Sequence, residues 1–191
     1  MRVLSSVAAA FAALCLPLLC GCVTAGTAPD SGSWKIERGY DRILGKPSGM
    51  AQLSARSRNE RQQSARYPLD QLQLGSLQLT CFDNAPVVRL EFNHRIGSNR
   101  SATLSYRFDD NPGRDAVARF LPGYKSAVIE DRNEVAGFVE QLRTSSKLYV
   151  RVASHVAGTS TVEFPVKGAP AAIEAAYQAC PIESSAKPRT A

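Results

Sequence analysis

Three of the five cysteines lie near the N-terminus, and the last of them is placed for covalent modification. Met1-Arg2 precedes a mostly apolar run from Val3 to Leu19, which is typical of a secretory signal peptide. The run leads into Leu-Leu-Cys-Gly-Cys, so an aliphatic residue stands three positions before Cys22 and a glycine directly before it. That spacing matches a bacterial lipobox, in which the cysteine thiolate takes up a diacylglyceryl group. The alternative is an ordinary signal peptide that happens to contain cysteines.

The residues after Cys22 have the composition of a tether. Segment 22–33 holds one charged residue and almost no large apolar side chain, so it cannot build a core. We predict a signal peptide over 1–21 and a lipidated tether over 22–33, with the membrane as a partner through acyl chains that contribute about 0.8 kcal/mol per buried methylene. This places the chain on the periplasmic side of a bacterial envelope, and Val23 after the cysteine favours the outer membrane.

The other cysteines form a predicted disulfide. Cys15 and Cys20 would leave with the signal peptide, and Cys22 would be acylated, so that Cys81 and Cys180 remain as an even pair in an oxidising compartment. A disulfide between them closes a loop of roughly 100 residues, worth about 4.7 kcal/mol on the chain-entropy model. Two separate buried thiols are the alternative.

The remaining reactive residue types form no catalytic or metal-binding motif. His94 and His155 have no second histidine or cysteine at ligand spacing, so we expect no metal site. Ser184 and Lys187 have a Ser-x-x-Lys spacing, but they lie in the C-terminal tail 183–191, where no pocket is expected to hold them. The glycine motifs of serine hydrolases and phosphate-binding loops are also missing. We therefore predict no catalytic residue and no cofactor.

Acidic residues offer weaker alternatives. Asp109 with Glu91 or Glu130 could act as a glycosidase pair, although nothing in the sequence brings them together. Asp109-Asp110-Asn111 lacks the spacing of a calcium loop and favours a polar turn. The single tryptophan, Trp34, is interpreted as a structural anchor rather than a ligand platform.

Positive charge is concentrated in one stretch. The chain has a formal net charge of +6, and residues 35–66 hold eight basic and three acidic residues. A candidate basic surface comprises Arg56, Arg58, Arg61 and Arg66. It would face anionic headgroups, lipopolysaccharide, a wall polymer or an acidic envelope protein, and nucleic acid is not expected outside the cytoplasm. The alternative is a solvated loop.

Hydrophobic periodicity predicts a single α+β domain over 34–182, mainly an antiparallel sheet of meander or sandwich type with two packed helices. Segment 76–130 has the pattern of a β-meander, with turn residues between its strands. The expected strands are Trp34–Tyr40, Met50–Arg56, Ser76–Phe82, Val87–Phe92, Ser101–Phe108, Ala116–Leu121, Lys125–Glu130, Lys147–Ala153 and Ser160–Val166, and the expected helices are 134–145 and 170–180.

Short motifs between residues 76 and 180 carry a family resemblance. They are Leu79-Thr-Cys81-Phe-Asp-Asn84, Ala102-Thr-Leu-Ser-Tyr-Arg-Phe-Asp109, Phe138-Val-Glu-Gln-Leu142, Leu148-Tyr-Val-Arg-Val152, Glu163-Phe-Pro-Val-Lys-Gly168 and Ala175-Ala-Tyr-Gln-Ala-Cys180. This region resembles the periplasmic VasI/TagO-type proteins associated with type VI secretion. The resemblance implies a small β-rich periplasmic domain without a cofactor, in an accessory role for secretion machinery. The lipobox and the segment before residue 76 depart from that pattern.

Three hypotheses follow for function. The leading one is a membrane-anchored envelope lipoprotein that acts as a non-catalytic interaction or accessory module. A hydrolase of cell-wall polymers or lipids would instead need converging carboxylates or a Ser/His pair. A small inhibitor or immunity-type protein that binds one secreted enzyme is the third.

Overall fold

A computed structural model describes residues 33–43, 45–61 and 73–182. Within these residues the chain forms a ten-stranded sheet and the helices α2 and α3. The elements are β1 (Lys35–Asp41), β2 (Lys46–Asn59), β3 (Leu74–Phe82), β4 (Ala85–Phe92), β5 (Ala102–Phe108), β6 (Arg114–Asp115), β7 (Arg119–Phe120), β8 (Ser126–Ile129), α2 (Arg132–Thr144), β9 (Lys147–Ser154), β10 (Gly158–Pro165) and α3 (Ala169–Ala176).

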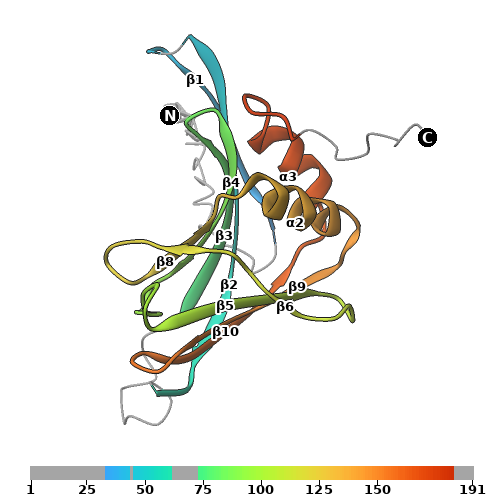
Figure 1. Cartoon of the computed structure of the whole chain (residues 1–191). Coiled ribbons are helices and arrows are strands. Elements are labelled where there is room, and N and C mark those ends of the chain that lie inside the picture. The colour runs from blue at the N-terminus through green and yellow to red at the C-terminus, as the bar shows by residue number, and fades with distance from the viewer. Residues whose placement is uncertain (1–32, 44, 62–72, 183–191) are drawn as a thin grey trace, which may run out of the picture.

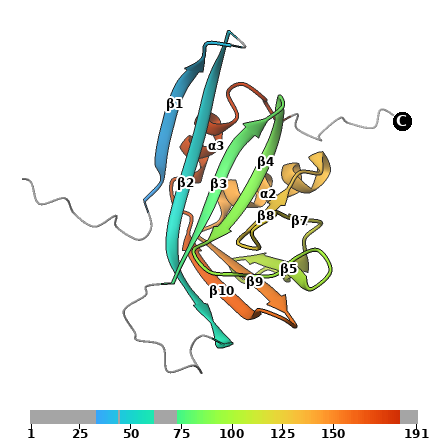
Figure 2. The ribbon, with the colours of Figure 1, turned by 90° about the vertical axis from the view of Figure 1, so that its left-hand side faces the viewer.

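The sheet is antiparallel and strongly curled, so that β5, β9 and β10 cross below β2, β3 and β4 (Figures 1 and 2). Its order is β6-β5-β9-β10-β2-β3-β4-β8-β7, and β1 pairs with β2 beside this path. Helices α2 and α3 lie against the inner face of the curl (Figure 1). The predicted α+β class, with a mainly antiparallel sheet and two helices in one domain, is confirmed.

Strand β2 shows why the sheet has an inner and an outer face. Ala51, Leu53 and Ala55 are buried and alternate with more accessible residues, because successive side chains in a strand point to opposite faces. Burying a leucine contributes about 1.5–3 kcal/mol, so the apolar set holds this face inward. The same alternation turns Arg56 and Arg58 outward.

Helix α2 closes the inner face as its sequence pattern predicts. Asp131 accepts hydrogen bonds from the backbone N–H groups of Asn133 and Glu134, both at 3.0 Å, and so caps the helix. Phe138 projects into the core, where its ring centroid lies 5.0 Å from those of Tyr106 and Phe108. These edge-to-face contacts fix the helix to β5.

Helix α3 approaches β2 more closely than a side chain would allow. A Cβ added at Gly49 would lie 1.9 Å from the carbonyl oxygen of Ala175. Only glycine fits there, because every other residue type would push the helix backbone away from the strand.

The predicted meander over 76–130 is wrong at one step. β4 pairs with β3 and β8, whereas β5 pairs with β9, from Ala102 opposite Ser154 to Phe108 opposite Leu148. The connection between β4 and β5 crosses the domain and buries Ile96 completely. Alternation shows which face of a strand is buried but leaves its neighbour undetermined, which is why the pattern did not reveal this crossing. The strand expected over Ala116–Leu121 is likewise only Arg119–Phe120.

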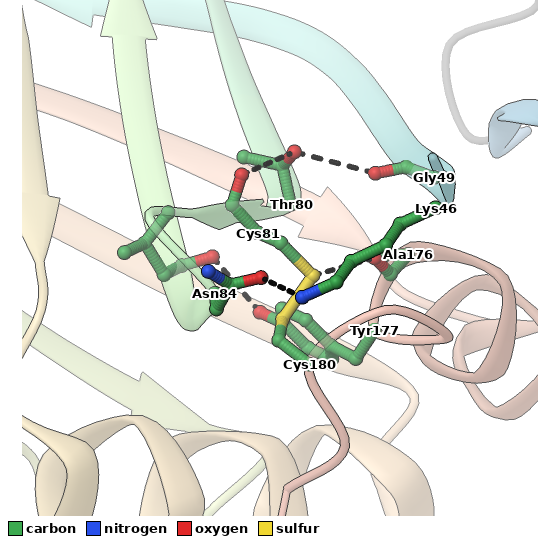
Figure 3. Close-up of a disulfide and its surroundings, with 9 residues drawn as sticks. Lys46, Gly49, Thr80, Cys81, Asn84, Ala176, Tyr177 and Cys180 are labelled. Carbon is green, nitrogen blue, oxygen red and sulfur yellow. Dashed lines mark hydrogen bonds between the residues drawn. A yellow bond between two sulfur atoms is a disulfide. The ribbon is translucent and has the colours of Figure 1, made fainter. Parts of the chain in front are cut away.

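The predicted cysteine pairing is present, and the last helix ends earlier than expected. Cys81 and Cys180 are bonded at 2.08 Å, with their Cα atoms 6.0 Å apart (Figure 3). Helix α3 ends at Ala176 rather than at residue 180. Its C-cap residue, Tyr177, donates its hydroxyl hydrogen bond to the carbonyl of Val87 at 2.9 Å, and the following turn carries Cys180 to the end of β3.

We expect replacement of both Cys81 and Cys180 by alanine to lower the free energy of unfolding by about 2–5 kcal/mol. The disulfide spans 99 residues, so its loss restores much of the freedom of the unfolded chain. Urea unfolding followed by Trp34 fluorescence would measure the change. Free thiols at both positions in the non-reduced protein would contradict the pairing.

Candidate functional site

A groove of about 760 Å³ lies on the outer face of β2, β10, β9, β5 and β6. Five arginines from four of these strands line it, and we call it the arginine groove. Its charged and aromatic lining residues are Arg56, Arg58, Arg107, Arg114, Arg151, Tyr149, Asp115 and Glu163.

Strand register sets the spacing of the arginines. Arg58 on β2 stands opposite Thr161 on β10, which stands opposite Arg151 on β9. Neighbouring strands lie about 4.8 Å apart, so the backbones of the two arginines are about 10 Å apart. Arg107 on β5 stands opposite Tyr149 on β9, two residues along from Arg151. The positive charges therefore cover a surface rather than a single point.

Most of these arginines are not neutralised by acidic neighbours. In the part of the chain that the structure describes, the ion pairs do not include Arg56, Arg58, Arg107 or Arg151. The two carboxylates of the groove have other contacts. Glu163 pairs with Lys147 at 2.8 Å, and Asp115 accepts a hydrogen bond from Ser105 at 2.7 Å. Five guanidinium groups against two carboxylates give the groove a net positive charge, which complements a negatively charged ligand.

Two of the arginines are held by aromatic rings. The guanidinium carbon of Arg107 lies 4.5 Å from the ring centroid of Tyr149, a cation–π distance. Arg114 lies 5.0 Å from the ring centroid of Tyr106 and also contacts its hydroxyl oxygen. Stacking restricts the motion of both side chains, so less conformational entropy is lost when a ligand binds.

Arg114 also joins a partly buried polar cluster at the edge of the sheet. The hydroxyl group of Tyr106 donates to Glu134 of α2 at 2.8 Å, and Arg114 lies 3.8 Å from the same carboxylate. Burial raises the pKa of the Tyr106 phenol above its ordinary value, and the hydrogen bond to Glu134 adds to this. This cluster ties the short strand β6 to the core.

The structure divides the basic surface expected from the sequence. Arg56 and Arg58 line the groove, whereas Arg61 donates to the backbone oxygens of Val156 at 2.7 Å and His155 at 2.8 Å. Arg61 therefore fixes the turn between β9 and β10. Arg66 lies outside the described residues, as do Cys22 and the Ser184/Lys187 pair.

Three groove arginines were missed by the sequence analysis: Arg107, Arg114 and Arg151. For Arg107 and Arg151 a signal existed, because each occupies an outward position in an alternating strand. That signal could not be used without knowing that β9 pairs with β10 and that β5 pairs with β9.

The candidate glycosidase carboxylates do not converge. Glu91 of β4 pairs with Arg89 at 3.2 Å, and Glu130 pairs with Arg119 at 2.7 Å. Asp109, the predicted partner of either glutamate, follows β5, which pairs with β6 and β9 and not with β4, which contains Glu91, or with β8, which precedes Glu130.

Asp109 has a structural role at the start of β9. Its carboxylate accepts hydrogen bonds from the backbone N–H groups of Ser146 and Lys147, at 3.1 and 2.8 Å. Within residues 33–43, 45–61 and 73–182, no group of three His, Cys, Asp or Glu residues could hold a metal ion.

A Ser/His pair is present, but a substrate cannot reach it. The Nε2 atom of His94 lies 3.0 Å from the hydroxyl oxygen of Ser160, which is completely buried. That hydroxyl also accepts from the Nδ2 atom of Asn59 at 2.8 Å. Burial lowers the pKa of His94, and the positive charge of Lys125 acts in the same direction. This polar cluster satisfies buried groups where β2 meets β10.

Trp34 anchors the start of β1, since its Nε1 atom lies 3.4 Å from the backbone oxygen of Val166 and its ring packs against Gly168. No helix in the described ranges has the length and apolar character needed to cross a bilayer. No family model, curated protein or solved structure matches the chain. The resemblance to VasI/TagO-type proteins therefore stays a prediction.

We expect stability to fall as the pH is lowered through the titration of His94. Its pKa is lower in the folded state than in the unfolded state, so below about pH 6.5 the unfolded chain binds more protons at this site. Urea unfolding at a series of pH values between about 7.5 and 5 would measure the slope. His94→Gln should reduce that slope, and His155→Gln is the matched control at an exposed position. An equal slope in wild type and His94→Gln would contradict the assignment.

Proposed function

We propose that this protein is a lipid-anchored accessory module of the bacterial envelope that binds an acidic protein partner through the arginine groove. The observation that carries the proposal is the set of outward arginines on adjacent strands, four of them without an ion pair among the described residues. These guanidinium groups can bind the anionic groups of a ligand, because arginine presents a planar fork of donors that fits carboxylates.

The lining favours an acidic protein segment over a uniform polyanion. Asp115 and Glu163 stand among the arginines, and they would repel a polymer that carries negative charge at every repeat. A polypeptide can place its carboxylates at the arginines and neutral or basic groups near these two acids. Tyr149 adds apolar contact area, and arginine and tyrosine are enriched at the centres of protein interfaces.

The location in the envelope rests on the N-terminal pattern and the disulfide. Cys22 follows a lipobox-type sequence, and the bond between Cys81 and Cys180 suits an oxidising compartment. A role beside secretion machinery is the form of this proposal that the VasI/TagO resemblance suggests. It requires no catalytic residue, only a charged binding surface such as the groove, where five of the fourteen lining residues are arginines.

We expect the double variant Arg58→Glu/Arg151→Glu to bind a poly-glutamate peptide at least about tenfold more weakly than wild type, because each charge-assisted hydrogen bond contributes about 1.5–3 kcal/mol. Fluorescence anisotropy with a labelled peptide would measure the affinity. Arg132→Glu/Lys167→Glu makes the same charge change at exposed residues outside the groove and should bind as wild type does. Equal weakening by both pairs would indicate a general charge effect, and tighter binding of polyphosphate than of poly-glutamate would contradict an acidic protein partner.

We expect the N-terminal peptide of the mature protein to begin at Cys22 and to carry acyl chains. Mass spectrometry of protein extracted from membranes would measure this. Cys22→Ala should leave the chain unacylated and shift it out of the membrane fraction, since a stable anchor needs more than one acyl chain. A mature N-terminus elsewhere, or an unmodified Cys22, would contradict the anchor.

A further inference from the structure

Three large apolar side chains are exposed at the end of the sheet farthest from the arginine groove. Ile43 is 93% exposed, Phe82 71% and Tyr40 63%. Ile43 belongs to the turn between β1 and β2, Tyr40 to the end of β1, and Phe82 to the end of β3 on the other side of β2. In Figure 1 this end of the β1–β2 hairpin extends beyond the helices.

Two hairpins meet at this end. β3 and β4 are joined by Asp83 and Asn84, both with positive φ, which is the tight turn that suits the twist of paired strands. Lys46, at the start of β2, donates a hydrogen bond to the side-chain oxygen of Asn84 at 3.2 Å (Figure 3). Asp41 accepts a hydrogen bond from the backbone N–H of Ile43 at 2.8 Å and shapes the other turn. We call this surface the hairpin tip, made of Tyr40, Ile43, Phe82 and the basic residues Arg38, Arg42 and Lys46.

We propose that the hairpin tip docks into the headgroup layer of a phospholipid membrane. Exposed Ile and Phe side chains cost free energy in water, and the boundary between headgroups and acyl chains removes that cost. Tyrosine suits the same boundary, because its ring is apolar and its hydroxyl is polar. The flanking arginines and lysine fit anionic headgroups, and their long side chains can keep the charge at headgroup level while apolar groups enter.

The proposal rests on the lipid anchor proposed above, and the chain lengths are compatible with it. Residues 22–33 can span at most about 40 Å, whereas β1 extends only about 20 Å from its start to the hairpin tip. A chain anchored at Cys22 can therefore bring the tip to the same membrane. About 33 Å of β2 separates Ser48 from Arg58, so the docked domain would present the arginine groove away from the membrane.

The test uses the mature chain in vesicles of phosphatidylethanolamine and phosphatidylglycerol that contain acyl-brominated lipids. A bimane label on Ile43→Cys should lose roughly half of its fluorescence, because the bromine atoms reach only probes near the acyl chains. The same label on Val156→Cys is the matched control, since Val156 is 58% exposed at the β9–β10 turn, at the other end of β2. Adding Phe82→Ser and Tyr40→Ser to the labelled Ile43→Cys chain should reduce the quenching.

The outcomes separate this proposal from the lipid anchor. Quenching at position 43 and not at 156 supports tip docking, whereas no quenching at 43, or equal quenching at both, overturns it. The mass of the N-terminal peptide tests the anchor independently. If Cys22 carries no acyl chain, the labelled chain is mixed with the same vesicles, and the same comparison of the two positions decides.

Discussion

The pairing of strand β2 with three partners is the constraint on which the rest of this structure depends. Its residues 46–52 pair with β1, residues 50–56 pair with β3, and residues 57–59 pair with β10. A strand that takes part in both halves of a curled sheet must be long, and its fourteen residues span about 46 Å. Gly49, near one end of β2, allows α3 to contact the strand backbone. Arg56 and Arg58, near the other end, line the arginine groove.

This arrangement separates two surfaces with different chemistry along one rigid element. The apolar and basic hairpin tip lies at the start of β2, and the arginine groove lies at its end. Because β2 is hydrogen-bonded to neighbouring strands along its length, the distance between the surfaces is set by the sheet and not by a loop. A membrane-bound domain built in this way can hold a partner site at a defined height, and a tether alone would leave that height variable.

Sequence periodicity predicted the faces of the strands and the presence of two helices, and counting cysteines predicted the disulfide, because each depends on local pattern or on number. It could not predict that β5 lies beside β9, since that pairing joins residues about 50 positions apart and any alternating strand could have taken the place. For the same reason, only part of the groove could be predicted from the sequence. Arg56 and Arg58 stand in a locally basic stretch, whereas Arg107 and Arg151 come from stretches of ordinary charge and become neighbours only through the sheet.

The buried polar cluster explains how β2 keeps its register against β10. Asn59 stands opposite Ser160, and both hydrogen-bond inside the domain, Ser160 also to His94. A slip of one residue would turn Asn59 outward and bring Arg58 into the core, because side chains alternate between faces. Such a slip would remove the Asn59 donor from the buried hydroxyl of Ser160, at a cost of about 1–3 kcal/mol, and would bury an unpaired charge, which costs more. The outward direction of Arg56 and Arg58 therefore depends on a buried serine that also bonds His94 and that, by residue type alone, would suggest a catalytic Ser/His pair.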